Sequence, residues 1–119
     1  MSFRAAVEAR DVDALEASLA PDVRFQSPAV YRAYEGRETT MVVLRAVLSV
    51  FQDFRYVDAL RDGDRELLRF AARVGDREVD GIDLIRRAPD GRVAELTVMV
   101  RPLSGLVAVR DAIAAQLAQ

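Results

Sequence analysis

The stretch Leu67–Arg101, with the sequence LLRFAARVGDREVDGIDLIRRAPDGRVAELTVMVR, decides the fold. Apolar and polar residues alternate through it in three runs, as expected for strands that bury one face. The runs are Leu67–Val74, Val79–Arg87 and Val93–Arg101. Gly75-Asp76 suits a tight hairpin, and Pro89-Asp90-Gly91 suits a second turn. The stretch therefore predicts three consecutive antiparallel strands.

The rest of the chain predicts helices before this sheet and one helix after it. Helical spacing of apolar residues predicts two short N-terminal helices, the second capped by Asp11 and closed by Pro21. A main helix with a broad apolar face is expected over residues 37–52, and a closing helix capped by Ser104 is expected near the end. Short strands are expected at 22–26 and 54–60, joined to the helices by an irregular connection over 27–36.

This order of elements predicts an α+β class within one domain over residues 1–119. We expect a cone-shaped, curved antiparallel sheet with the N-terminal helices and one long helix covering its concave face, as in a cystatin-like α+β roll. A cavity would lie between the sheet and the helices.

The composition excludes several classes of function. The chain has no His and no Cys, and all 17 basic residues are Arg. We therefore expect no cofactor and no metal, and any acid–base chemistry must use Asp, Glu or Tyr. The net charge is −2, with the arginines spread along the chain, which gives no indication of nucleic-acid binding. The apolar runs are too short for a membrane span, so we expect a cytoplasmic protein, and the Arg bias suggests a bacterial source.

Alternation assigns Asp83 to the inner face of the sheet, with Gly81 and Ile85. Burial would raise the pKa of the Asp83 carboxyl, which could then serve as a protonated hydrogen-bond donor or as a proton shuttle. In the alternative interpretation, a backbone group or an arginine such as Arg69 or Arg73 simply holds this carboxylate.

The other residues of the predicted pocket are apolar, and Ser27 or Tyr31 could add a hydroxyl at its rim. The predicted lining consists of Phe3, Val7, Phe25, Val47, Phe51, Phe54, Leu68, Phe70, Leu96, Val98 and Val100. Such a lining suits a small hydrophobic ligand, but the same side chains could also fill a closed core. An open pocket of about 300 Å³ or more with Asp83 at its base would favour the ligand.

Several segments together resemble the nuclear transport factor 2-like superfamily over essentially the whole chain. They are Ala5–Leu15, Leu19–Phe25, Tyr34–Glu38 and Gly81–Leu96. That superfamily includes ketosteroid isomerase, limonene epoxide hydrolase, SnoaL-like polyketide cyclases and members without known activity, so the fold alone does not fix the function.

The resemblance implies site positions that this chain fills only in part. Ketosteroid isomerase uses a Tyr, an Asp base and a protonated Asp, which correspond here to Phe3, Ser27 and Asp83. The epoxide hydrolase would need a second Asp where Val98 stands, and the cyclases use a His–Asp pair although this chain has no His. The established routes of these relatives are therefore not expected.

The outer face of the sheet carries Ile82, Leu84 and Met99, which predicts a homodimer through that face. For function, we expect a domain that binds a small hydrophobic ligand. It could also act as a weak carboxyl-based isomerase, cyclase or hydrolase that uses Asp83, with Ser27 or a Tyr as helper. The alternative is a non-catalytic dimeric interaction or scaffold domain whose cavity is only core.

Overall fold

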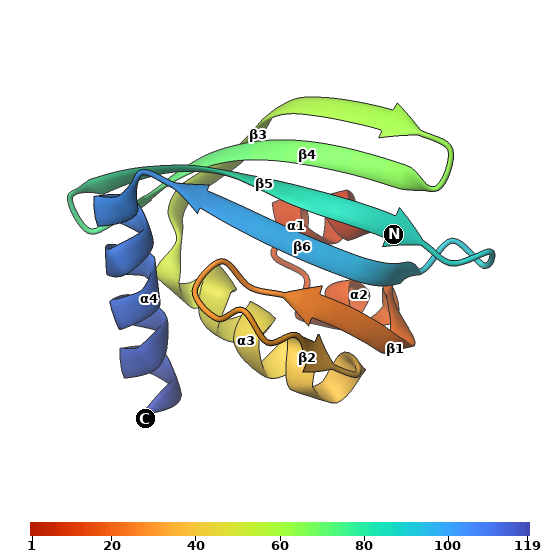
Figure 1. The fold of residues 1–119 in the computed structure, drawn as a ribbon, viewed down its shortest axis with the longest axis horizontal. Helices are drawn as coiled ribbons and strands as arrows, with labels where there is room; N and C mark the ends of the chain where they lie inside the picture. Colours follow the sequence, from red (N-terminus) through yellow and green to blue (C-terminus); the bar gives the residue numbers. More distant parts are fainter.

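A six-stranded sheet forms the body of the molecule in the computed structural model, which describes residues 1–119 (Figure 1). Four consecutive strands form an antiparallel meander, and two more extend it at the β6 edge, so the order is β2-β1-β6-β5-β4-β3. The strands are β1 (Leu19–Gln26), β2 (Tyr34–Glu35), β3 (Gln52–Asp62), β4 (Arg65–Val74), β5 (Arg77–Arg87) and β6 (Val93–Arg101). The α+β class is confirmed, with one difference from a purely antiparallel sheet: β1 runs parallel to β6.

Four helices accompany the sheet, and none is long and apolar enough to cross a bilayer. They are α1 (Phe3–Ala9), α2 (Val12–Ala17), α3 (Arg37–Val50) and α4 (Leu103–Leu117). Figure 1 shows α1, α2 and α3 gathered under the arch of the sheet, with α4 projecting from the end of β6 towards α3.

The helix boundaries follow local chemistry, with two corrections to the expected caps. The Ser2 hydroxyl accepts a hydrogen bond from the Ala5 N–H, and Asp11 caps α2 as predicted by accepting from Ala14. Pro21 does not close α2, because the helix ends at Ala17 and Pro21 lies within β1. Ser104 does not cap the last helix either, since α4 already begins at Leu103, next to Pro102.

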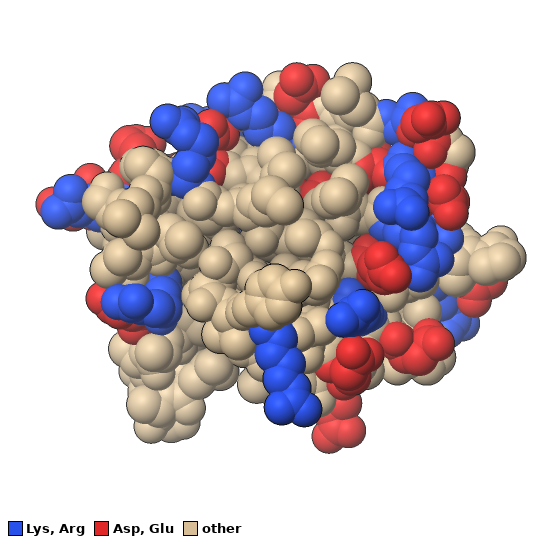
Figure 2. All heavy atoms as spheres, viewed as in Figure 1, with Lys and Arg blue, Asp and Glu red and all other residues tan.

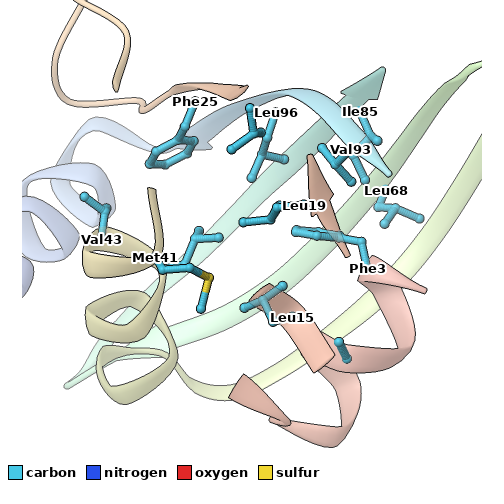
Figure 3. Packing of buried hydrophobic residues seen from close by; sticks show 13 residues of the cluster. Phe3, Leu15, Leu19, Phe25, Met41, Val43, Leu68, Ile85, Val93 and Leu96 are labelled. Carbon is cyan, nitrogen blue, oxygen red and sulfur yellow. The ribbon is translucent and has the colours of Figure 1, made fainter. Parts of the chain in front are cut away.

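The inner face of the sheet is the face that the helices cover. On β5, Ile85 lies opposite Leu96, and Asp83 lies between Leu68 and Val98. Figure 3 shows the main core, in which side chains from the helices and from the sheet point towards one another. Its larger side chains are Phe3, Leu15, Leu19, Phe25, Met41, Leu44, Leu68, Ile85 and Leu96.

A second, smaller core is built around Phe70 and depends on a glycine. It contains Phe51 at the end of α3, Phe70 on β4 and Val109 on α4. The Phe70 ring lies over Gly81 on the neighbouring strand, where a Cβ atom would stand 2.3 Å from Cζ of the ring. Gly81 therefore gives Phe70 the space to lie flat against β5.

Candidate functional site

A cavity of about 310 Å³ lies between the inner face of the sheet and helices α1, α3 and α4. Of its 29 lining residues 23 are hydrophobic, which makes the space suitable for an apolar molecule. Val30 and Leu117 belong to the lining although 46% and 48% of their surfaces are exposed, so they mark the mouth. The cavity thus opens between the segment that follows β1 and the end of α4.

The structure places most of the predicted pocket residues on this wall. Those on the wall are Phe3, Val7, Phe25, Val47, Phe51, Phe54, Phe70, Leu96, Val98 and Val100. Leu68 is a correction: it faces inward but is fully buried in the main core with Phe3 and Leu15, and it does not line the cavity.

The two hydroxyl groups expected at the rim have different positions. Ser27 lines the cavity, and its Oγ accepts a hydrogen bond from the Val30 N–H at 3.2 Å. This bond holds the turn at the mouth and leaves Ser27 without a partner that could make it a base. Tyr31 is wholly exposed and does not line the cavity, because the segment after Ser27 turns its side chain to solvent.

Asp83 is the buried carboxyl of the cavity wall, with only 7% of its surface exposed. Its Oδ2 accepts a hydrogen bond of 2.8 Å from the Tyr56 hydroxyl, and its cross-strand neighbours are the apolar Leu68 and Val98. Burial raises the pKa of Asp83 to about 7, against the opposing effect of the Tyr56 hydrogen bond. The carboxyl is therefore divided between its neutral and charged forms near neutral pH.

Tyr56 is the residue that sequence reasoning missed. Burial and the neighbouring Asp83 raise the pKa of its hydroxyl well above the ordinary range, so Tyr56 remains a donor at all working pH values. The available signal was the two-residue spacing of Phe54 and Tyr56, which places both rings on one face of a strand. In the structure both are half-buried, whereas their neighbours on β3 are exposed. An aromatic hydroxyl at such a position needs a polar partner, and Asp83 is that partner.

The interpretation in which Arg69 or Arg73 holds Asp83 is wrong. Arg69 binds Asp80 and Arg73 binds Asp53, both through their guanidinium groups and away from the cavity. No cation therefore neutralises Asp83, whose only hydrogen bond within the protein is the one from Tyr56.

This arrangement can donate or accept one hydrogen bond at a defined point of an otherwise apolar wall. In its neutral form Asp83 carries a proton on the oxygen that Tyr56 does not occupy, and it can donate that proton to a ligand oxygen. The other charged side chains on the wall, Glu8, Arg10 and Arg110, belong to residues of α1, its C-terminal end and α4 that are largely exposed. No group of three or more His, Cys, Asp or Glu side chains could hold a metal ion.

Comparisons with known proteins agree with this fold. A family model described as a SnoaL-like domain matches residues 2–96. A crystal structure from Pseudomonas aeruginosa, named a steroid delta-isomerase, is 42% identical, with a TM-score of 0.93 over 98% of this chain and 86% of that chain. An uncharacterised bacterial protein with a cystatin-like fold, from Silicibacter pomeroyi, is 34% identical, with a TM-score of 0.91 over 96% of this chain and 81% of that one.

A more distant structure shares the fold. It is a protein from Catenulispora acidiphila with a ketosteroid isomerase-like fold, in complex with trimethylamine. Its identity is 17% and its TM-score 0.68, over 90% of this chain and 87% of that chain. A search among curated proteins gives no match.

Proposed function

We propose that this chain, which belongs to the SnoaL-like domain family of the nuclear transport factor 2-like superfamily, binds a small apolar molecule by one polar oxygen. The observation that carries the proposal is the hydrogen-bonded pair of Tyr56 and Asp83 in an apolar cavity of about 310 Å³. The polar atom of the ligand would lie against Asp83, and its hydrocarbon part would fill the space lined by the phenylalanines.

The chemistry of Asp83 favours a carbonyl group as that polar atom. A neutral carboxylic acid donates a hydrogen bond to a carbonyl oxygen, whereas an ionised carboxylate repels it. In a water-poor apolar site this bond is worth more than at a surface, and an unpaired carbonyl there would be costly. A hydrophobic ketone or lactone therefore fits the wall better than a hydrocarbon of the same shape.

Thermal shift measured with matched ligands would test this binding. A hydrophobic ketone should raise the melting temperature of the wild-type protein at pH 6, and the hydrocarbon of the same skeleton should raise it less. The shift by the ketone should shrink at pH 8.5, because Asp83 is then ionised. Equal shifts by ketone and hydrocarbon at both pH values would contradict the proposal and favour a non-catalytic scaffold whose cavity is only core.

Variants of the pair provide the matched controls. Asp83→Leu should abolish the preference for the ketone, and Asp83→Asn should keep a donor but lose the dependence on pH. Tyr56→Phe should weaken ketone binding, because the hydrogen-bonded partner of Asp83 is lost. Asp80→Asn on the outer face and Tyr31→Phe at an exposed position should both behave as the wild type.

A second candidate function is double-bond isomerisation in an unsaturated ketone, and one observation favours it: the 42% identity to a structure named a steroid delta-isomerase. In such a reaction a proton leaves the carbon next to the carbonyl and returns two carbons further along, while a donor stabilises the enolate oxygen. Asp83 could supply the donor. Ser27, which is no base, stands where the resemblance places the proton acceptor, so we expect slow turnover at most.

Absorbance of the conjugated product would measure this activity. Incubation with a 5-ene-3-ketosteroid should convert it to the 4-ene-3-ketone, slowly in the wild type and faster in a Ser27→Asp variant that restores a carboxylate base. No conversion by either protein would exclude this second function without affecting the binding proposal.

We also propose that the outer face of the sheet pairs with a second copy of the chain. Ile82 and Leu84 are only partly covered, Met99 is 55% exposed, and Figure 2 shows an uncharged area in the middle of the face with charges around its edge. An apolar centre with a polar rim is the usual composition of a protein interface. Sedimentation at micromolar concentration should show a dimer that Met99→Arg dissociates, and a wild-type monomer would refute the pairing.

A further inference from the structure

Helix α1 presents two charged side chains to the back of the Tyr56–Asp83 pair. The Arg4 guanidinium carbon lies 5.5 Å from the centroid of the Tyr56 ring, within the range of a cation–π interaction. One helical turn later, Glu8 holds the same guanidinium, with Nε of Arg4 3.3 Å from Oε1 of Glu8. The Arg4 guanidinium of this ion pair is therefore in contact with the ring whose hydroxyl binds Asp83.

We propose that Arg4, held by Glu8, is a positioning residue that fixes the Tyr56 ring and sets how strongly its hydroxyl binds Asp83. The physical effect depends only on the contacts described above, while its use in ligand recognition rests on the proposed function. Since α1 also lines the cavity through Phe3 and Val7, the helix would both shape the site and tune its one polar group.

Electrostatics supports two opposing influences on Tyr56. After the larger effects of burial and Asp83, the charge of Glu8 raises the pKa of Tyr56 and the charge of Arg4 lowers it. A cation near the ring makes the hydroxyl a better donor, and an anion makes it a poorer one. The effects of the two charges on the Tyr56 hydroxyl therefore partly cancel in the wild type. When one charge is removed, the effect of the other is no longer compensated.

The remaining surroundings of the pair are apolar, which makes the two charges the relevant ones. Phe54 meets the Tyr56 ring edge-on at 5.0 Å, and Phe70 lies opposite Tyr56 on β4. Asp83 faces Leu68 on β4 and Val98 on β6. Apart from Tyr56 itself, no titratable side chain among these neighbours faces Asp83.

The proposal predicts shifts of opposite sign from two similar variants. Arg4→Gln should leave the charge of Glu8 uncompensated, weaken the hydrogen bond from Tyr56, and raise the pKa of Asp83. Glu8→Gln should leave Arg4 uncompensated, strengthen that bond, and lower the pKa of Asp83. Each shift should be roughly 0.3–0.7 pH unit, the size expected from a partly exposed cation–π contact.

Titration of the Asp83 carboxyl by NMR, in protein labelled with ¹³C at the aspartate carboxyl carbons, would measure these shifts without any ligand. In the double variant Arg4→Gln/Glu8→Gln the pKa of Asp83 should return close to its wild-type value. In Arg4→Lys, which keeps the positive charge, that pKa should change only slightly. Arg45→Gln is the matched control, because Arg45 forms a comparable pair with Glu16 at 3.1 Å that does not contact Tyr56. This control should leave the pKa of Asp83 unchanged.

Shifts of the same sign in both single variants, or no shift in either, would overturn the proposal. Both side chains are close to half exposed, at 41% and 49%, so neither substitution opens the core. Because the readout needs no ligand, the titration can succeed while the ligand screen fails, which separates this proposal from the proposed function. A shift in the Arg45→Gln control equal to that in Arg4→Gln would also overturn it.

Discussion

Asp80 and Asp83 lie three residues apart on β5 and point to opposite faces of the sheet, with opposite consequences for their charge. On the outer face, Asp80 accepts two hydrogen bonds of 3.0 Å from Arg69 and one of 3.3 Å from Arg101. The Arg69 hydrogen bond holds the pKa of Asp80 below its usual value. On the inner face, Asp83 meets only the neutral Tyr56 hydroxyl, and burial raises its pKa to about 7.

The difference shows that alternation decides which carboxyl is available for chemistry. A carboxylate that is bound by arginines stays ionised, and its oxygens are already hydrogen-bonded. It serves as part of a surface ion pair. A carboxyl without a cation in an apolar wall can gain or lose a proton near neutral pH. The same residue type on one strand thus provides a surface ion pair on one side and a candidate site on the other.

The largest expected effect concerns the pH dependence of stability. The pKa of Asp83 is about 7 in the fold and close to its ordinary value of 3.8 in the unfolded chain. The folded state therefore binds more protons between these values, and stability should fall as pH rises from about 4 to beyond 7, by up to about 4 kcal/mol. Asp83→Asn should remove this loss.

Urea unfolding at a series of pH values from 4 to 9 would measure the effect. If Asp83→Asn and the wild type lose stability in parallel over this range, the inner carboxyl is not the group responsible. Asp83 would then be ionised in the folded protein, as Asp80 is.

A smaller effect is expected at Gly81, between the two carboxyls. An added Cβ would lie 2.3 Å from the Phe70 ring and 2.6 Å from the carbonyl oxygen of Met99. Gly81→Ala should therefore cost about 1–3 kcal/mol of unfolding free energy, the range seen for overpacked cores. Adding Phe70→Leu to this variant should recover only part of the loss, because the contact with the Met99 carbonyl oxygen remains. A fully stable Gly81→Ala protein would show that the ring has other space.

The smallest effect is expected on the outer face. Asp80→Asn should cost less than about 1 kcal/mol at pH 7, because its partners Arg69 and Arg101 are solvated. Since the folded-state pKa of Asp80 is lowered, its contribution should be present above the unfolded pKa and disappear as pH falls below about 4. A urea series extended downward to about pH 2 would detect it. A loss as large as that for Gly81→Ala would mean that the outer pair is more than a surface contact.

Much of the site could be predicted because a strand has a period of two. The inward direction of Asp83, and the neighbours Gly81 and Ile85 on its face, follow from the pattern alone. The same rule places Arg69 and Arg73 outward with the odd-numbered residues of β4, so the sequence itself argued against them as partners of Asp83. Both arginines therefore lie on the face of β4 opposite to the one that Asp83 shares with Leu68.

The partner of Asp83 could not be found in this way. Tyr56 reaches Asp83 from β3 across β4, so the contact joins strands that are not neighbours in the sheet. The pairing of β3 with β4 is also irregular, because its register shifts between Gln52 and Arg55 and again between Tyr56 and Asp58. A period of two predicts the face of a residue, but the curvature that brings β3 towards β5 is a property of the whole sheet.

The wall of the cavity is built from two parts of the chain, and only one of them matches the family model. Residues 2–96, which match the family model, supply most of the sheet, the buried carboxyl and its partner. Val109, Ile113 and Leu117 come from the 15-residue helix α4 beyond them. Substitutions in this one helix could therefore change the size of the cavity without altering either member of the polar pair. Relatives that keep the same pair could in this way differ in the size of the molecule that their cavities admit.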